Sequence, residues 1–169
     1  YEAGGPANFK RFFASIRSLR SGGMELPSVA VPPERLPDAG FYHPRAPRVF
    51  EDVQQYLEWY ASYRSPEPAG QQSARVAFLI HRRVISDMLS SGVDELIMRS
   101  EMEGIIPIVF WEHPAQQARL ASLLSAARID VLVNLTHMQG GDIRRNDFLE
   151  LDVPVIQTLR FSEGSAADW

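Results

Sequence analysis

The spacing of apolar residues changes near the middle of the chain. Over 7–20 and again over 49–63, apolar residues recur at intervals of three and four, which predicts two amphipathic helices. The intervening residues 26–48 are dense in proline, which fixes φ and lacks a backbone donor, so we expect an extended segment laid over a surface. Residues 65–73 have the Pro, Gly, Gln and Ser content of a linker.

Short apolar runs alternate with helical patterns from residue 75 onward. Strands are predicted over 75–81, 105–110, 130–135 and 153–159, and helices over 86–103, 114–127 and 142–150. The first of these helices is expected to pack through its apolar positions, which are Met88, Leu89, Val93, Leu96 and Ile97. Strands that alternate with helices indicate a parallel sheet with right-handed crossovers, and uninterrupted apolar strands indicate helices on both faces.

The predicted fold is therefore α/β, with a parallel, Rossmann-like sheet and flanking helices, preceded by a helical and proline-rich arm. The expected divisions are an arm over 1–64, a linker over 65–74 and an α/β domain over 75–169. The chain opens without Met and stops at Trp169, just after a segment typical of a helix beginning. We therefore expect it to be a piece of a longer chain.

Composition narrows the possible functions. A net charge of −4 and a pI of about 5.6 give no electrostatic reason to expect nucleic acid or an anionic membrane as partner. The chain has no cysteine, which excludes disulfides, zinc–thiolate sites and thiol catalysis, and which fits a reducing compartment such as the cytoplasm. No apolar run approaches the roughly 18 residues of a membrane-spanning helix.

Three of the four histidines lie at the end of a predicted strand or just past it. His81, His113 and His137 would gather at one edge if those strands are parallel neighbours. That edge, outside the carboxyl ends of the strands, is where open α/β sheets bind ligands. Because histidine is the commonest metal ligand, these three residues are also candidates for holding a metal. The alternative is that each imidazole closes a strand end and hydrogen-bonds a nearby carbonyl.

Other side chains that suit a planar, carboxylated ligand are predicted at the same edge. Guanidinium groups hold carboxylates in a bidentate fork, and aromatic rings stack on planar ligands. The candidates are Arg82, Trp111, Asn134 and Arg160, with His43 brought onto the sheet by the proline-rich arm. A solvated arginine at the rim and a packed His43 are the alternatives.

No phosphate-binding loop accompanies these residues. Neither G-x-x-x-x-G-K-[ST] nor G-x-G-x-x-G occurs, so ATP hydrolysis and dinucleotide binding in the usual manner are not expected. Gly140-Gly141-Asp142 is more typical of a turn with a helix cap than of an anion site.

Four local motifs, in their order along the chain, carry a resemblance to a known family. They are Gly4-Gly5-Pro6-Ala7-Asn8-Phe9; Gly40-Phe41-Tyr42-His43-Pro44 with Ala46-Pro47 and the segment 49–52; the strand–helix–strand unit 75–110; and Leu151-Asp152-Val153-Pro154-Val155-Ile156-Gln157, with Trp169 after it. Together they resemble the large subunit of the ATP-dependent tetrapyrrole metal chelatases, of the CobN cobaltochelatase and magnesium-chelatase type. The second motif is the most specific, since the family pattern is G-[IVL]-Y-H-P-x-A-P.

The resemblance implies a subunit that binds the tetrapyrrole while separate AAA+ subunits hydrolyse ATP, so that ATP acts only through those partners. The substrates would be a tetrapyrrole and a divalent metal (cobalt, magnesium or iron), and the remaining domains of the same large subunit would be partners. The chain departs from the family at Ile80-His81-Arg82-Arg83-Val84, at His113 and at His137. These departures leave open a haem-binding relative that inserts or removes iron.

Two further alternatives belong to other functional classes. In the first, the chain is a non-catalytic scaffold that docks other domains or the ATPase subunits. In the second, it is an unrelated module that binds a small molecule at the same edge. No residue is assigned as catalytic.

Overall fold

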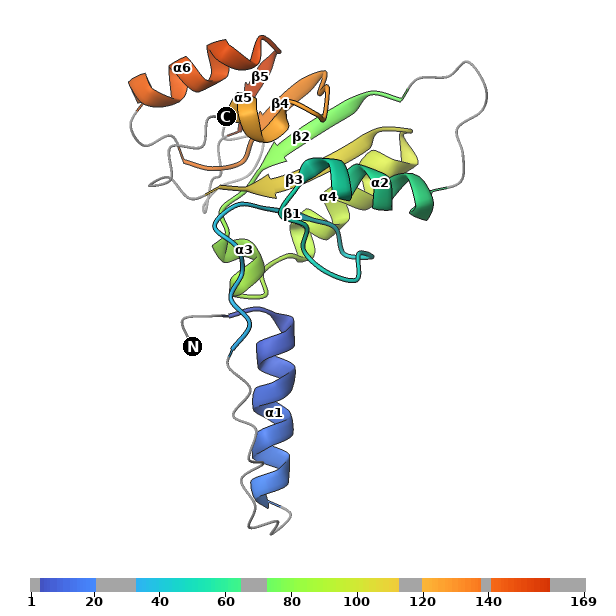
Figure 1. Cartoon of the computed structure of the whole chain (residues 1–169), viewed down its shortest axis with the longest axis vertical. Coiled ribbons are helices and arrows are strands. Elements are labelled where there is room, and N and C mark those ends of the chain that lie inside the picture. The colour runs from blue at the N-terminus through green and yellow to red at the C-terminus, as the bar shows by residue number, and fades with distance from the viewer. Residues whose placement is uncertain (1–3, 21–32, 65–72, 113–119, 138–140, 159–169) are drawn as a thin grey trace, which may run out of the picture.

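A single five-stranded sheet forms the centre of the protein in the computed structural model, which describes residues 4–20, 33–64, 73–112, 120–137 and 141–158 (Figure 1). The strands are β1 (Gly40–Tyr42), β2 (Arg75–Leu79), β3 (Ile106–Trp111), β4 (Val131–Asn134) and β5 (Val155–Gln157). Their order across the sheet is β1-β3-β2-β4-β5. The predicted α/β fold is confirmed, and β2, β3, β4 and β5 are parallel as expected.

The outermost strand β1 was not predicted. It lies within the proline-rich segment and runs antiparallel to β3, with Phe41 opposite Phe110. The strand is only three residues long, between Pro37 and Pro44, so its apolar pattern is too short to be distinguished from an extended loop. Proline is compatible with this position because an edge strand uses the hydrogen-bonding groups of one side only.

Helices cover both faces of the sheet. The covering helices are α2 (Val53–Tyr63), α3 (Arg83–Ser86), α4 (Ser91–Met102), α5 (Leu120–Leu124) and α6 (Gly141–Leu151), while α1 (Pro6–Arg20) lies apart from the sheet. Alternate strand residues point to opposite faces: Ile108 and Phe110 join the core beneath α2 and α5, whereas Val109 and Trp111 join the core beneath α3 and α4. Strands β1, β2 and β3 carry buried residues on both faces, as the continuous apolar runs predicted, whereas β4 is buried on one face and only partly buried on the other.

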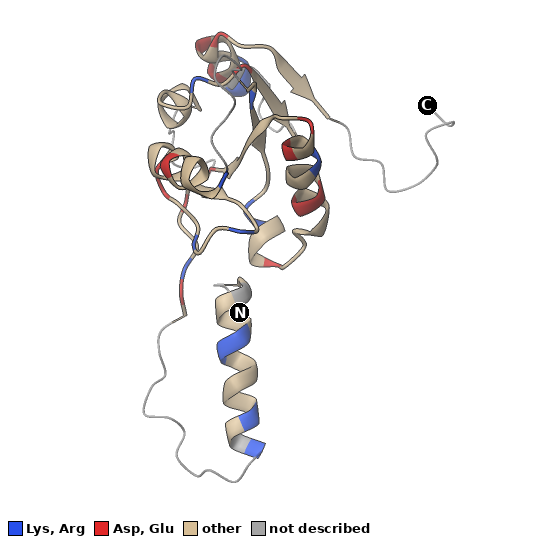
Figure 2. Cartoon of the chain, turned by 90° about the vertical axis from the view of Figure 1, so that its right-hand side faces the viewer, with Lys and Arg blue, Asp and Glu red and all other residues tan. Residues whose placement is uncertain are grey.

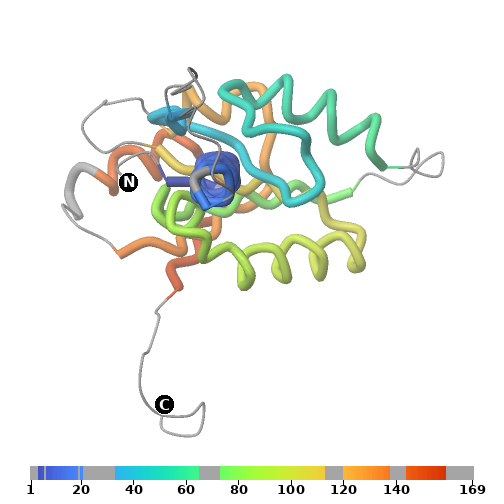
Figure 3. The backbone as a smooth tube through the Cα atoms, turned by 90° about the horizontal axis from the view of Figure 1, so that it is seen from below, coloured from blue at the N-terminus to red at the C-terminus, as the bar shows by residue number. Residues whose placement is uncertain are grey.

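The predicted division at 65–74 does not separate two hydrophobic cores. One buried cluster contains Phe41 and Tyr56 from the segment assigned to the arm and Ala77 and Ile108 from the segment assigned to the α/β domain. The reason is the pairing of β1 with β3, which draws residues 40–60 into the same sheet and onto its surface. Among the described residues of the expected arm, only α1 projects from the body, as Figures 1 and 2 show; Figure 3 looks along this helix.

Two predicted helices have different limits in the structure. The helix expected over 49–63 begins at Val53, because Asp52 caps it by accepting a hydrogen bond from the Gln55 amide, and Phe50 instead forms a bridge with Phe41. The helix expected over 86–103 is interrupted between α3 and α4, where Met88 has a φ of 57°.

That interruption corrects the expected packing face. Met88 and Leu89 lie at the break and are exposed by 48% and 68%, so they do not take part in the core. The break is stabilised by the Leu89 amide, which donates to the Val84 carbonyl. The remaining part of the face is confirmed, since Ile97 is fully buried with Val93 and Leu96 packed around it.

Helix α1 is attached to the body at its amino-terminal end. The Gly5 amide donates to the Ser86 carbonyl at 2.7 Å, and a Cβ on Gly4 would lie 2.4 Å from the same carbonyl oxygen. Asn8 adds a second tether, because its side chain donates to and accepts from the Glu34 backbone. The free length of the helix carries basic residues without acidic ones, visible in blue in Figure 2. None of the helices in the described part of the chain combines the length and apolarity needed to cross a membrane.

The amino-terminal half of β3 is an open strand edge that side chains protect. Strand β1 pairs only with Val109–Trp111, so Ile106–Ile108 have no strand partner on that side within the described part of the chain. Pro107 has no amide hydrogen to leave unpaired, and its carbonyl accepts a hydrogen bond from the buried Tyr56 hydroxyl. This arrangement removes both backbone groups of Pro107 from the exposed edge and so discourages pairing with another chain.

We predict that Tyr56→Phe lowers the free energy of unfolding by about 1–3 kcal/mol, because it leaves the buried Pro107 carbonyl without its donor. Urea denaturation followed by circular dichroism measures the change. Tyr63→Phe is the matched control, since the same hydroxyl is removed from the same helix at a 40% exposed position. Equal effects of the two substitutions would contradict the role assigned to the Tyr56 hydroxyl.

Candidate functional site

The strand order places a topological switch point between β2 and β4. The chain passes from β2 to β3 on one side and then crosses back over β2 to reach β4 on the other side. In open α/β sheets, the crevice outside the carboxyl ends of the two strands at such a point is the usual ligand site. The residues that follow β2 and β4 are therefore the first to consider.

His81 and His137 lie together at this switch point. His81 follows the end of β2 and His137 follows the end of β4, and because these strands are parallel neighbours, the imidazole centroids are 6.3 Å apart. Both residues are exposed. Burial and then the proximity of His137 lower the pKa of His81, with a smaller contribution from Arg83, and this shift favours the neutral imidazole.

Asn134 is buried beneath the histidines and shapes the segment that carries one of them. Its amide nitrogen donates to the Gln157 side chain at 2.7 Å, and its oxygen accepts from the amide and hydroxyl of Thr136. Both acceptor positions of the oxygen and one N–H of the amide are therefore used by protein partners. Asn134 fixes the turn before His137 and is not directed toward a ligand.

Trp111 lies at the same end of the sheet but is fully buried. Its indole nitrogen donates to the Pro37 carbonyl at 3.0 Å, and a Cβ on Gly40 would meet the ring at 2.6 Å. The ring has no open face on which a planar ligand could stack, so the expectation that Trp111 contacts a ligand is corrected. Its apolar volume is used in the core beneath α3 and α4.

Arg82 is half-buried beside the pair of histidines. Its guanidinium lies 3.6 Å from the Asp38 carboxylate, which is supplied by the segment leading into β1. At this partly exposed position the ion pair is weak, so the guanidinium remains available to a ligand carboxylate.

A buried ion pair also lies at this end of the sheet. The Glu112 carboxylate, which follows β3, is paired with Arg144 of α6, and Arg144 is also 3.5 Å from Asp147. Burial raises the pKa of Glu112, although Arg144 opposes the shift. The pair could not be found from the sequence, because the distance between Glu112 and Arg144 along the chain gives no local signal.

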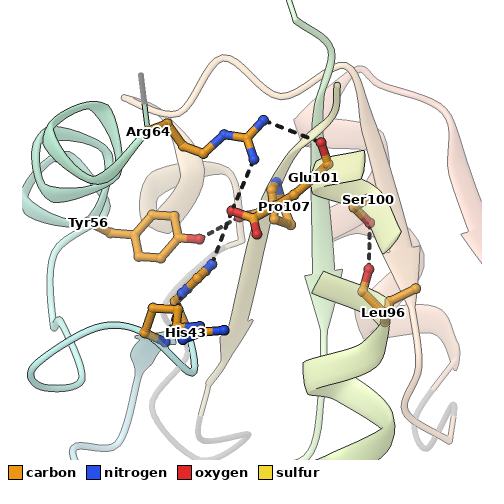
Figure 4. Close-up of polar contacts among 8 residues, drawn as sticks. His43, Tyr56, Arg64, Leu96, Ser100, Glu101 and Pro107 are labelled. Carbon is orange, nitrogen blue, oxygen red and sulfur yellow. Dashed lines mark hydrogen bonds and ion pairs between the residues drawn. The ribbon is translucent and has the colours of Figure 1, made fainter. Parts of the chain in front are cut away.

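His43 lies elsewhere, so its expected place among the ligand residues is corrected. It follows the carboxyl end of β1, and because β1 is antiparallel to β3, this end faces away from the switch point. The residue is 2% exposed. Figure 4 shows its ring directed toward Glu101 at the end of α4, with Arg64 on the other side of the carboxylate.

The environment of His43 selects one protonation state. The Arg45 amide donates to Nδ1 at 3.1 Å, so the proton of the neutral ring is on Nε2, which faces Glu101 Oε1 at 3.4 Å. Burial lowers the pKa of His43, and Glu101 opposes this only in part. The rings of Trp59 and Tyr63, with centroids 4.9 and 5.2 Å away, supply the low-polarity surroundings.

This environment predicts a loss of stability on acidification. Because the native pKa lies below the ordinary value of 6.5, the unfolded chain binds a proton that native His43 refuses, so the free energy of unfolding falls as pH drops through 6.5. The expected slope is up to about 1.4 kcal/mol per pH unit. Urea denaturation between pH 5.5 and 8 measures it.

His43→Asn, whose side-chain oxygen can replace Nδ1 as acceptor, should flatten that slope whatever its effect at neutral pH. His81, whose pKa is also lowered, adds to the slope in the same direction, so His81→Asn is the comparison at an exposed position and should remove a smaller part of the slope than His43→Asn does. A steep slope that persists in His43→Asn would assign the proton to another group.

Two candidates lie outside the described residues, namely His113 and Arg160. Within the described ranges, no cluster of three or more His, Cys, Asp or Glu residues is placed to hold a metal. His81 and His137 alone are close together, so the three-histidine metal site stays a prediction.

Comparison with known proteins gives consistent results. The family model described as CobN/Magnesium Chelatase matches residues 1–169. The magnesium-chelatase subunit ChlH, chloroplastic, of Oryza sativa subsp. indica and of subsp. japonica is 28% identical over 151 residues, covering 78% of this chain and 11% of the relative. The catalytic subunit of cobaltochelatase from Mycobacterium tuberculosis has a similar fold, with a TM-score of 0.56 at 17% identity over 92% of this chain and 12% of that chain. The chain thus spans about a tenth of these proteins.

Proposed function

This chain belongs to the CobN/magnesium chelatase family, and we propose that it forms part of a large subunit that inserts a divalent metal into a tetrapyrrole. The part of the site that it contributes is the switch-point edge of the sheet, with His81 and His137 facing the ligand. The observation that carries this assignment is the convergence of two exposed imidazoles at the position where open α/β sheets bind ligands.

The chemistry of these residues suits the reaction. Insertion of a divalent metal into a tetrapyrrole requires groups that accept the two pyrrole protons and groups that replace water on the incoming ion. A neutral imidazole does both, because its ring lone pair binds a proton or a metal. Arg82 provides a cation beside the histidines for a tetrapyrrole carboxylate.

The nucleotide chemistry is assigned to other chains. The sequence has no phosphate loop, which supports separate AAA+ subunits as the site of ATP hydrolysis and as partners. The other domains of the large subunit would complete the cleft. The cytoplasm stays the predicted compartment, while the curated relatives are named as chloroplastic.

Two alternatives remain predictions. A relative that binds haem and inserts or removes iron would use the same two histidines. A scaffold that docks other domains would use this edge for packing, and its histidines would have no ligand.

We predict that protoporphyrin IX, haem or a cobyrinate-type corrinoid binds saturably and shifts its Soret or visible absorption. His81→Ala and His137→Ala should each weaken binding about tenfold, a loss of about 1.4 kcal/mol. His113→Ala tests the third predicted histidine in the same titration. The tightest of the three ligands selects among the proposed chemistries.

Arginine substitutions provide a matched pair for the same titration. Arg82→Ala removes the cation at the edge, whereas Arg99→Ala removes an exposed cation from α4 and should leave the affinity unchanged. Absence of any spectral shift in the folded protein, with all three ligands, would refute the tetrapyrrole site and favour the scaffold.

A further inference from the structure

We infer that His81 and His137 form a two-imidazole site for a divalent transition-metal ion, and that the metal substrate is therefore of the cobalt or iron class and not magnesium. That the bound ion is a substrate rests on the proposed function, whereas the site itself rests on the geometry of the two rings. It goes beyond the family, which includes both cobalt and magnesium enzymes by name.

The two imidazole rings are close enough to share one ion. With metal–nitrogen bonds of about 2 Å, two imidazoles that share one ion have ring centroids roughly 5–6 Å apart. The observed separation is 6.3 Å, with the ring planes inclined by 42°. Both side chains are exposed, so small rotations about their own torsions close the remaining gap without movement of β2 or β4.

The segments that carry His81 and His137 are held in place by the sheet. The two strands that carry the histidines are hydrogen-bonded neighbours, with Leu79 opposite Asn134, and the Leu135 amide donates to the Leu79 carbonyl beyond the paired region. Asn134 then fixes the turn through Thr136. The separation of the histidines is therefore set by the sheet and does not depend on a flexible loop.

The nitrogen donors of the two rings decide which class of metal ion the site favours. Imidazole nitrogen suits cobalt, iron, nickel, copper and zinc, whereas magnesium takes oxygen ligands and releases its water reluctantly. Carboxylates are the groups that would favour magnesium. At this end of the sheet, the Glu112 carboxylate is buried and paired with Arg144, so it is not available to an ion at the two rings.

The charges around the pair keep the site weak. Arg83 is close enough to lower the pKa of His81, and the same positive charge opposes a cation. Two neutral ligands leave most of the coordination sphere of the ion to water. Such a site exchanges its ion readily, which is what a position that delivers a metal substrate requires.

The test is a titration of the protein, free of any affinity tag and of tetrapyrrole, with Co²⁺ and separately with Mg²⁺. Proton NMR of the imidazole Cε1–H signals reports where the paramagnetic ion binds. We expect Co²⁺ to broaden the signals of His81 and His137 first and to leave that of the buried His43 sharp. A tenfold excess of Mg²⁺ should shift none of them.

Substitutions separate a shared site from two independent imidazoles. His81→Ala and His137→Ala should each weaken Co²⁺ binding at least tenfold, and the double variant should lose less than the sum of the two single losses in free energy, because either substitution already breaks the shared chelate. His43→Asn, checked for folding by circular dichroism, should bind Co²⁺ as the unchanged protein does.

Three results would overturn the inference: Co²⁺ affinities within twofold of the unchanged protein in both single variants, broadening of all histidine signals together, or Mg²⁺ binding at these rings. Failure here is distinguishable from failure of the proposed function. The tetrapyrrole titration uses metal-free protoporphyrin IX among its ligands, and the Co²⁺ titration contains no tetrapyrrole.

Discussion

The pairing of β1 with the carboxyl-terminal half of β3 is the contact on which most of this structure depends. It places Gly40 against the Trp111 ring, so closely that a Cβ would lie 2.6 Å from it. Only glycine permits this approach. Through this contact a proline-rich segment with little regular structure becomes the edge of the sheet, and the residues on both sides of it acquire fixed positions.

The consequences extend to both ends of the strand. Before β1, Pro37 accepts the Trp111 indole hydrogen and Asp38 reaches Arg82 near the switch point. After β1, His43 enters the aromatic surroundings of α2 and faces Glu101 at the end of α4. The polar cluster seen in Figure 4 therefore links the helices that cover opposite faces of the sheet around its open edge.

The histidines consequently divide into two physical classes. His43 is buried, its tautomer is selected by the Arg45 amide, and its lowered pKa makes it a contributor to stability that acid removes. His81 and His137 are exposed at the end of the sheet where the direction of strand addition reverses, and no hydrogen bond to another described side chain or backbone group engages their rings. Residue type alone does not distinguish these classes. Burial does.

The sequence by itself determined the alternation of strands and helices, the parallel sheet and the gathering of His81 and His137 beyond two strand ends. It could do so because side-chain period and strand order are local or nearly local properties, and because the carboxyl ends of parallel strands share an edge. Its family motifs agreed with the match over the whole chain.

Only the tertiary structure decided what β1, Trp111, His43 and Arg144 do. A three-residue strand has too few positions to show a period, and an aromatic residue at a strand end is compatible with a ligand until the packing of Gly40 closes its face. The direction of β1 reversed the expected position of His43, and the partner of Glu112 is far away in sequence. These features depend on contacts between distant segments, which no local pattern encodes.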